Sequence, residues 1–485
     1  MNMKTKFLAA VLALLVSGSL YAQPAQDSQN TWSPGPVHPI ELAGDSMAIL
    51  PVWEQAKLMN LLLAEKQQII LPQVMRETGV DMWIVGRGEE HLYLSLLESE
   101  EDGLVRDEPD FLVFFDRGDR AGTAAGVTGA GDMERLQVEL EDLAGIITER
   151  DPAVIAVNQA RQSRRGRGLS TFSESARAEL DDAIGAELAS RIVPAGLLTN
   201  RWLGTRTPAE VSIFKHVTRI AHEVIAEAFS NQVIVPDVTS TDELNWWILQ
   251  RYEDLGLGTV DYPTITIQRS LADREKYDDD DEYFRAFDER FIDDLSPMNG
   301  YSIIIRRGDL LFNDTGIKYL GLYTDTQQSA YVLREGETAA PEGLKEVMRH
   351  INRFQDLIGE EMRPGRDGNE IGVAAAERAR QEGIKNPKLY SHSLMYWFMR
   401  YELLGRFFSR EVHNAGSGMS SEGRPSREGN EVRENTYFAL ELDVEYELPE
   451  WDGQNIVVFS ETTMMFSERG MEYPGGRQTE WYLIR

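Results

Sequence analysis

The chain has 485 residues and a formal net charge of −31, with 49 Lys and Arg against 80 Asp and Glu. Because nucleic acids and anionic membrane surfaces both require a basic protein surface, this balance argues against either as a partner. A hydrophobic content of 42% is enough for a sizeable core, and the length predicts two domains. The chain has no cysteine, which excludes disulfides and thiolate metal sites.

The first 22 residues have the pattern of a secretory signal peptide. Two lysines precede an apolar run from Phe7 to Val16, and a small-residue stretch follows, with Ala22 as the candidate cleavage point. The apolar run is too short to span a bilayer. We therefore predict a secreted protein, periplasmic in a Gram-negative source, with no membrane insertion once the signal is removed. The polar, proline-rich residues 23–44 predict a flexible leader.

Residues 45–202 alternate between strand-like and helix-like segments. The strand-like runs are DMWIVG (81–86), DFLVFFDRG (110–118) and AVIAVN (153–158), and amphipathic segments flank them. Strands that alternate with helices predict an N-terminal α/β domain with a central sheet. Its one histidine, His91, is expected on the solvated surface.

A domain boundary is predicted near residue 203, where a new helix begins. Thr207 can cap this helix, and Glu210 completes a capping box. Apolar residues then recur at helical spacing on one face. His216 and His222 lie six positions apart on the same helix. That spacing places them on different faces, so we expect structural roles for both.

The rest of the chain mixes helices with strands. Helices are predicted at 239–256, 341–361 and 370–381, and strands at 259–270 and in the C-terminal runs NTYFALELDVEY, NIVVFSETTMMF and TEWYLI. The dense acidic segment 272–294 lacks the glycine and glutamate spacing of an EF-hand, so a solvated insertion is expected there.

Five polar side chains stand inside apolar, strand-like runs of this second half: Asp314, Asp325, His392, Glu441 and Glu461. The two aspartates flank a glycine-bearing reversal, so adjacent antiparallel strands can bring both to one face. A buried carboxylate is costly unless it is paired, hydrogen-bonded or bound to a metal. Four carboxylates and one imidazole suit a pair of divalent cations, and favour manganese, zinc, cobalt or iron(II) over calcium. For any single residue, an outward-facing acid on a half-buried strand remains the alternative.

The order Asp, Asp, His, Glu, Glu resembles the pita-bread metallopeptidases, a family that includes methionine aminopeptidase, Xaa-Pro aminopeptidase, prolidase and creatinase. The segments that carry the resemblance are DLLFNDTGIKYLGLYTDTQQSAYVL, EEMRPGRDGNEI, NTYFALELDV and VVFSETTMMFSERGMEY. EWDGQ and GRQTEWYLI are similar to an exported bacterial branch. The resemblance implies an α/β N-terminal domain at 45–202 of the prolidase and creatinase type. An α+β pita-bread (creatinase/aminopeptidase) catalytic domain would follow at 203–485.

The same resemblance implies roles for the five residues. Asp314 would hold one of two divalent metal ions, Asp325 and Glu461 would bridge them, and His392 and Glu441 would complete the second. Manganese is the first expectation, with zinc, cobalt or iron as alternatives. A hydroxide that bridges the metals would attack the scissile carbonyl, with Glu441 as the catalytic proton acceptor. The implied activity is that of an aminopeptidase or dipeptidase that cleaves N-terminal Xaa-Pro bonds of a peptide substrate. A homodimer is also implied.

The sequence departs from the family pattern in the groups that handle protons and hold the substrate. The family has a histidine before the first metal aspartate, whereas residues 223–349 contain none. Met399 stands seven positions after His392, where the family has a second histidine, and His413 is the candidate catalytic residue to supply it. Phe459 replaces an arginine. Two alternatives follow: a pita-bread protein of weak or no activity that binds peptides or partners, and a creatinase-like C–N hydrolase. The retained five-ligand set argues against the second.

Overall fold

The structure is a computed structural model of the whole chain. It describes residues 49–86, 110–118, 133–158, 162–163, 166–167, 172–259, 262–277, 282–285, 301–394, 418–423 and 429–485. The predicted signal peptide and leader, most of the acidic segment 272–294, and His91, Met399 and His413 lie outside these residues. None of the helices in the described part of the chain is both long and apolar enough to cross a membrane.

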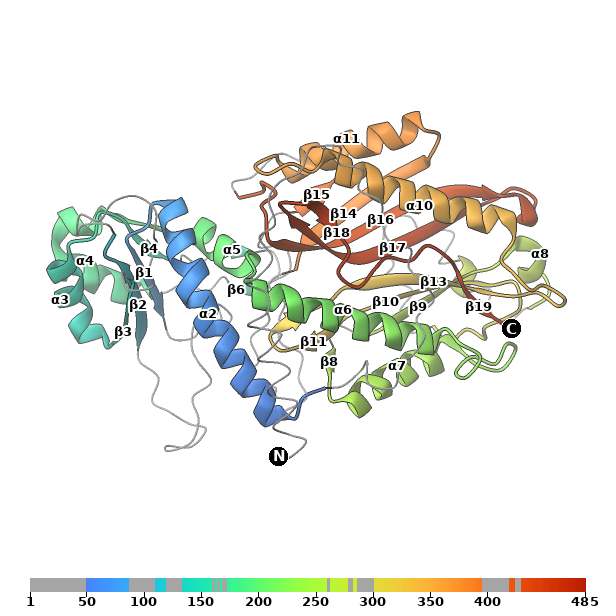
Figure 1. Cartoon of the computed structure of the whole chain (residues 1–485), viewed down its shortest axis with the longest axis horizontal. Coiled ribbons are helices and arrows are strands. Elements are labelled where there is room, and N and C mark those ends of the chain that lie inside the picture. The colour runs from blue at the N-terminus through green and yellow to red at the C-terminus, as the bar shows by residue number, and fades with distance from the viewer. Residues whose placement is uncertain are drawn as a thin grey trace, which may run out of the picture.

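The N-terminal part is built around a mixed five-stranded sheet with the order β3-β2-β1-β4-β7 (Figure 1). Its strands are β1 (Met82–Gly86), β2 (Phe111–Asp116), β3 (Met133–Val138), β4 (Ile155–Val157) and β7 (Ile192–Pro194). Its helices are α2 (Val52–Thr78), α3 (Leu140–Arg150) and α4 (Glu174–Ala189), and β5 (Gln162–Ser163) pairs with β6 (Gly166–Arg167). Strands β1, β2 and β4 are buried along their whole length, which explains their unbroken apolar runs. The predicted α/β organisation is confirmed.

Helix α5 (Gly196–Gly204) leads from this sheet into α6 (Pro208–Ala228), and α7 (Thr241–Leu255) follows. The capping box predicted for α6 is present: Thr207 Oγ1 accepts from the Glu210 amide at 3.3 Å, and Glu210 Oε2 accepts from the Thr207 amide at 2.7 Å. These bonds satisfy two backbone donors that the first turn of a helix leaves unpaired. Local chemistry is therefore enough to fix where this helix begins.

The C-terminal part contains one large sheet with the strand order β15-β14-β16-β17-β13-β10-β9, to which β18 and β19 add. Its strands are β9 (Thr264–Gln268), β10 (Leu310–Thr315), β13 (Thr326–Val332), β14 (Lys385–Ser393), β15 (Gly418–Ser420), β16 (Thr436–Leu448), β17 (Gln454–Ser467), β18 (Gly470–Glu472) and β19 (Tyr482–Ile484). Its helices are α8 (Leu271–Arg274), α10 (Glu342–Glu361), α11 (Gly368–Gln381) and the 3₁₀ turn η5 (Pro449–Trp451). Helices α10 and α11 pack on β14–β17, while α6 and α7 lie on the other side, with α6 against β13 and α7 against β9 (Figure 1).

The segment around the two aspartates is more elaborate than the single reversal that the sequence predicts. Strands β10 and β13 pair antiparallel as expected, but Asp314 lies opposite Gln327 and not Asp325. Between them, β11 (Ile317–Tyr319) and β12 (Leu322–Tyr323) form their own hairpin. It joins β8 (Gly258–Thr259) in a separate small sheet. The inserted hairpin shifts Asp325 to the position just before β13.

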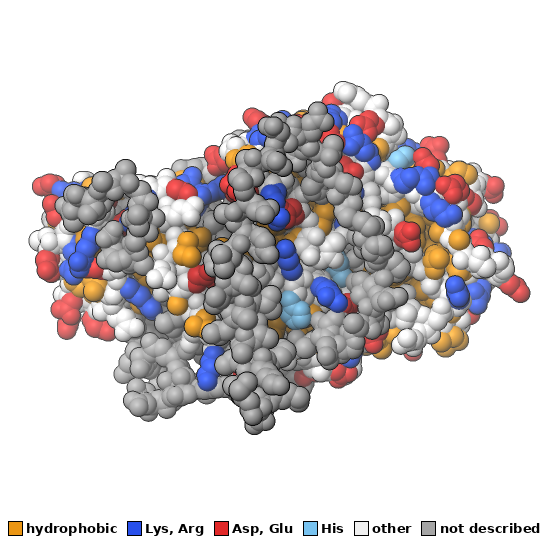
Figure 2. Space-filling model, viewed as in Figure 1, with side chains coloured by type: hydrophobic (Ala, Val, Ile, Leu, Met, Phe, Trp, Pro, Cys, Tyr) orange, Lys and Arg blue, Asp and Glu red, His pale blue; other side chains and the backbone are white. Residues whose placement is uncertain are grey.

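The described surface carries charges of both signs. Figure 2 shows acidic and basic side chains interspersed over this face of the molecule. On α10 and α11 these charges are paired: Arg353 contacts Glu360 and Glu382, and Arg378 contacts Glu360 and Glu361. Part of the acidity of the chain is therefore matched locally by arginine.

Candidate metal centre

Four polar side chains stand in one row across four adjacent strands of the large sheet. Asp314 on β10 is the register partner of Gln327 on β13, Gln327 is the partner of Glu461 on β17, and Glu461 is the partner of Glu441 on β16. Directly opposed residues on neighbouring strands project from the same face, so the row forms one continuous polar surface. Strand pairing therefore assembles residues that are up to 147 positions apart (461 − 314).

His392 and Asp325 flank this row. His392 on β14 is the register partner of Ala439, which precedes Glu441 by two residues and shares its face of β16. Asp325 precedes Gln327 by two residues, and so stands beside it. All five residues expected from the sequence to bind metal are thus on the same face of the sheet.

Three of the five residues converge closely. Asp325, His392 and Glu461 each offer one ligand atom, and these atoms all lie within 4.8 Å of one another. His392 Nε2 lies 3.5 Å from Asp325 Oδ2 and 3.6 Å from Glu461 Oε1. The other two residues, Asp314 and Glu441, both hydrogen-bond to Gln327. The structure therefore gathers a three-residue group with two further carboxylates beside it.

The electrostatics of the group favour a cation. Burial and the neighbouring charges of Asp325 and Glu441 raise the pKa of Glu461 well above its usual value. Burial and Asp325 likewise raise the pKa of Glu441. For His392, burial lowers the pKa, but the neighbouring carboxylates of Asp325 and Glu461 outweigh it and hold this pKa well above the ordinary value. Carboxylates in a buried cluster repel one another, and a positive charge between them relieves that repulsion.

The donor set fits a divalent transition metal. Glu461 Oε1 is buried and has no hydrogen-bond partner among the described residues, yet it points to within 3.6 Å of the imidazole. A buried carboxylate oxygen that makes no hydrogen bond costs free energy, and a bound cation would offset that cost. One imidazole nitrogen together with carboxylate oxygens is a set that manganese, zinc, cobalt and iron(II) all accept.

Gln327 is a residue of the centre that the sequence did not single out. Its Nε2 donates to Asp314 Oδ2 at 3.4 Å and to Glu441 Oε1 at 3.2 Å, and the residue is only 3% exposed. The available signal was strand alternation, because Gln327 follows Asp325 by two residues and therefore shares its face. An amide among carboxylates gave no reason from the sequence alone to expect a functional role.

The other histidines lie elsewhere. His222 is buried in α6 and hydrogen-bonds to the backbone at Gly475, and His216 packs edge-on against Tyr319. The position opposite Asp314 on β9 is Thr264, in the stretch where a histidine is missing. Among the described residues, His392 is therefore the histidine of this centre, and His413 lies outside them.

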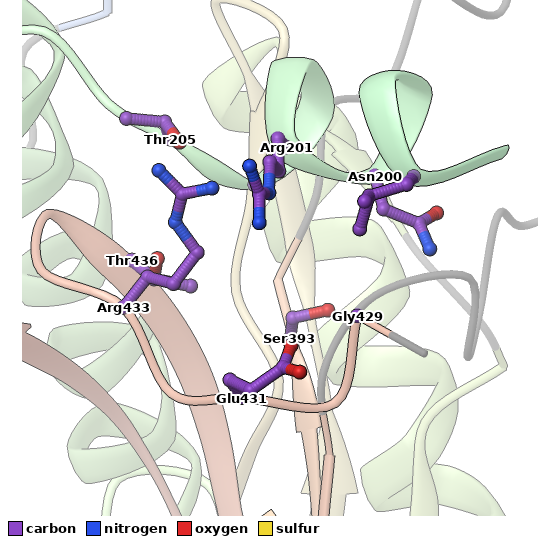
Figure 3. A pocket seen from close by; sticks show the side chains of 10 residues that line it. Asn200, Arg201, Thr205, Ser393, Gly429, Glu431, Arg433 and Thr436 are labelled. Atoms are coloured by element: carbon purple, nitrogen blue, oxygen red, sulfur yellow. The ribbon is translucent and has the colours of Figure 1, made fainter. Parts of the chain in front are cut away.

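A small hollow lies where α5 approaches the end of β14 (Figure 3). It is lined by Leu197, Asn200, Arg201, Gly204, Thr205, Ser393, Gly429, Glu431, Arg433 and Thr436. Its volume of about 20 Å³ has room for about one water molecule. Ser393 lines the hollow and follows His392 directly in the sequence. The two side chains nevertheless face opposite sides of β14, because adjacent residues of a strand do so.

The comparisons with known proteins agree with this geometry. Residues 212–468, more than half of the chain, match the family model described as metallopeptidase family M24. The chain belongs to this metallopeptidase family, whose members depend on metal. The comparison with curated proteins finds no match.

Solved structures give the same fold. The chain is similar to the crystal structure of an X-Pro aminopeptidase from Thermotoga maritima, with 14% identity and a TM-score of 0.50, over 85% of this chain and 99% of that one. It is also similar to an Xaa-Pro dipeptidase from Bacillus anthracis, with 14% identity and a TM-score of 0.47 over 87% and 100% of the two chains. A dipeptidase from Mycobacterium ulcerans matches with 15% identity and a TM-score of 0.48 over 87% and 98%. At 14% identity, the likeness to the X-Pro aminopeptidase shows the α/β and pita-bread architecture and not a substrate.

Proposed function

We propose that this protein is a metal-dependent exopeptidase that cleaves the bond after the N-terminal residue of a peptide, with a preference for proline in the second position. The observation that carries the proposal is the convergence of Asp325, His392 and Glu461 from three parts of the sheet, within 4.8 Å of one another, in a chain of metallopeptidase family M24. Structural relatives with Xaa-Pro specificity support the choice of substrate.

In this proposal the five residues hold up to two divalent cations. Asp325, His392, Glu441 and Glu461 surround one position, and Asp314 serves the other together with Asp325 and Glu461. Manganese is the metal of first choice because of the oxygen-rich set. Cations bound there would supply a polarised substrate carbonyl and a water that ionises near neutral pH.

Glu441 is the group proposed to move the proton. It stands directly opposite Glu461 and beside the converged group, and its pKa is raised by burial and by Asp325. A carboxylate placed beside the reacting water can accept its proton and return it to the leaving amine. Its neighbours on the row hold it in place through the hydrogen bond from Gln327.

The direct test is hydrolysis of Xaa-Pro dipeptides and short Xaa-Pro oligopeptides by the purified full chain. Activity should require added Mn²⁺ or Co²⁺, disappear with a chelator, and be abolished by Asp325→Ala. Arg349→Ala, a change in an exposed ion pair on α10, is the control that should retain full activity. Hydrolysis that is absent with every metal tested, or that survives Asp325→Ala, would contradict the proposal.

One observation favours a second candidate, a peptide-binding protein of weak activity. Thr264 occupies the β9 position opposite Asp314, and residues 223–349 contain no histidine to hold a substrate there. Calorimetry with an Xaa-Pro peptide distinguishes the two candidates. Saturable binding without turnover would support the second, whereas multiple turnovers would support the first.

We also propose that the chain is exported and works on peptides outside the cytoplasm, as its N-terminal sequence indicates, and that it forms a homodimer. Detection of a mature chain that lacks the first 22 residues would test export. Sedimentation of the full chain would test the dimer.

A further inference from the structure

Gln327 occupies the middle of the row that the proposed metal ligands form. Neighbouring strands lie about 4.8 Å apart, so Asp314 and Glu461, which stand two strands apart, are separated by about 10 Å at the backbone. Gln327 is the register partner of both. A cation shared by Asp314 and Glu461 would therefore compete with the side chain of Gln327 for the space between these two residues.

The amide of Gln327 is held in that space. Its nitrogen carries two protons and donates to two carboxylates, Asp314 at 3.4 Å and Glu441 at 3.2 Å. With 3% exposure the side chain is not solvated, and its Oε1 is buried without a hydrogen-bond partner among the described residues. The amide is a neutral donor, and its two N–H groups partly satisfy these two carboxylates, as a bound cation would.

The two proposed cation positions differ in how far Gln327 occupies them. The ligand atoms of Asp325, His392 and Glu461 already converge, and none of the hydrogen bonds described for Gln327 involves them. A cation next to Asp314 has to displace the amide from that carboxylate, and a hydrogen bond to a charged group contributes more than a neutral one. The second bond, to Glu441, restrains one ligand of the first position, but the other three ligands of that position already converge. Preorganisation therefore favours the first position and opposes the second.

We propose that Gln327 makes the two cation positions unequal, so that one divalent cation binds strongly at Asp325, His392 and Glu461, and the side chain of Gln327 weakens the binding of a second cation at Asp314. The inference rests on the proposed function only in taking this cluster as the metal centre. According to this inference, the number of bound ions depends on the side chain of Gln327, which is not one of the five proposed ligands.

The experiment counts and ranks bound Mn²⁺, without reference to hydrolysis. The full chain is stripped with a chelator, dialysed and titrated with Mn²⁺ alone, and bound metal is measured by elemental analysis at each free concentration. Gln327→Thr shortens the side chain and keeps a residue that suits a strand. Gln328→Thr is the matched control, since Gln328 is equally buried on the same strand but faces the other way and bonds to Tyr482.

The wild type should bind one Mn²⁺ strongly and a second at least about tenfold more weakly, the size of effect typical of residues around a metal site. Gln327→Thr should raise the affinity for the second ion by about tenfold or more and leave the affinity for the first unchanged, whereas Gln328→Thr should behave as the wild type. Asp314→Asn should leave the strong ion in place, and His392→Ala should remove it.

The inference would be overturned if the wild type bound two ions with equal affinity or bound no ion strongly. It would also be overturned if the affinity for the second ion were unchanged in Gln327→Thr. If Gln327→Thr fails to fold, two ions of equal affinity in the wild type, or loss of the strong ion in Asp314→Asn, would still overturn the inference. Absence of peptide hydrolysis would overturn the proposed function and leave this result standing, because the two measurements are separate.

Discussion

His392 and Glu441 show how two residues of one centre can have different tasks. His392 supplies a nitrogen ligand to the converged group, while Glu441 lies one strand away from its register partner Glu461 and bonds to Gln327. The first side chain should therefore determine whether a cation binds. The second should determine how fast a proton moves.

Replacement of these residues separates binding from chemistry. Glu441→Gln keeps the shape and the hydrogen-bonding capacity but cannot accept a proton, so kcat/KM for an Xaa-Pro peptide should fall by about 10²- to 10⁴-fold. Glu441 is also a proposed ligand of the strong Mn²⁺, so this ion should bind more weakly, but Asp325, His392 and Glu461 should still hold it at saturating Mn²⁺. His392→Ala should lose both the metal and the activity. Parallel assays of kcat/KM and bound metal check this, and loss of the strong ion in Glu441→Gln would contradict the assignment.

His222 gives the fold a dependence on pH that is independent of the metal centre. Burial lowers its pKa from 6.5 to about 4, against the opposing effect of a hydrogen bond to the backbone at Gly475. The folded pKa is below the unfolded one, so this residue's contribution to stability is complete above about pH 6.5 and is lost as the pH falls toward 4. The full effect is about 3 kcal/mol.

His222→Gln should flatten this part of the pH profile. Between pH 6.5 and 4.5 the wild type should lose more free energy of unfolding than the variant, as measured by urea unfolding at fixed ionic strength. Titrating carboxylates act equally in both proteins, so the difference between the two curves isolates His222. Parallel curves would show that His222 titrates normally.

Among the secondary-structure elements, α11 is placed by two glycines. A Cβ added to Gly372 would lie 2.5 Å from the backbone oxygen of Ser420 on β15, and one added to Gly368 would lie 2.1 Å from that of Gly418. The helix can approach β15 only because these side chains are missing. Strand β15 pairs with β14 at His392, so the helix supports the metal centre from behind.

Gly372→Ala should therefore destabilise the protein although alanine favours helices. The contact is with backbone, which cannot move aside cheaply, so the cost should be about 1–3 kcal/mol. Gly145→Ala on α3 is the matched control, because nothing lies within 4 Å of its added Cβ, and it should be neutral or stabilising by up to about 1 kcal/mol. Thermal unfolding of both variants measures the contrast, and equal effects would refute it.

At the scale of the whole molecule, the N-terminal sheet and the large sheet meet at a buried junction. Trp202 on α5 is fully buried there and packs edge-on against Trp83 of β1, and the ammonium of Lys66 lies 5.0 Å from its ring centre. Lys66 also donates to the carbonyl of Thr205 and lies 3.8 Å from Glu210. Arg433 and Glu77 form a further ion pair across the junction. Helix α2 is thus tied to the first turn of α6.

Trp202→Ala should loosen this junction. Removal of a buried tryptophan typically costs about 3–5 kcal/mol, and here the loss should fall on the contact of α2 and α5 with the rest of the chain. Hydrogen exchange should rise in α2 and α5 more than in β16 and β17. Trp246→Ala, at a side chain that is 59% exposed, is the control that should change neither stability nor exchange. Uniform acceleration across both sheets would show that the junction is not a separate unit of stability.

Much of the fold could be predicted from short stretches of the sequence. The capping box at Thr207 and Glu210, the buried apolar strands β1 and β2, and the amphipathic helix α10 all follow from short-range chemistry. The sequence also predicted the five candidate ligands, because polar side chains in apolar strands are costly without a purpose, and their order indicated the family.

Only the tertiary structure decided how those ligands are arranged. The inserted β11–β12 hairpin and the pairing of β13 with β17 set the register, and a shift of one residue would have turned every side chain to the opposite face. That register brings Asp325, His392 and Glu461 together and places Gln327 between Asp314 and Glu461. Neighbours along a strand are fixed by the chain, whereas neighbours across a sheet depend on long-range pairing that no single segment encodes.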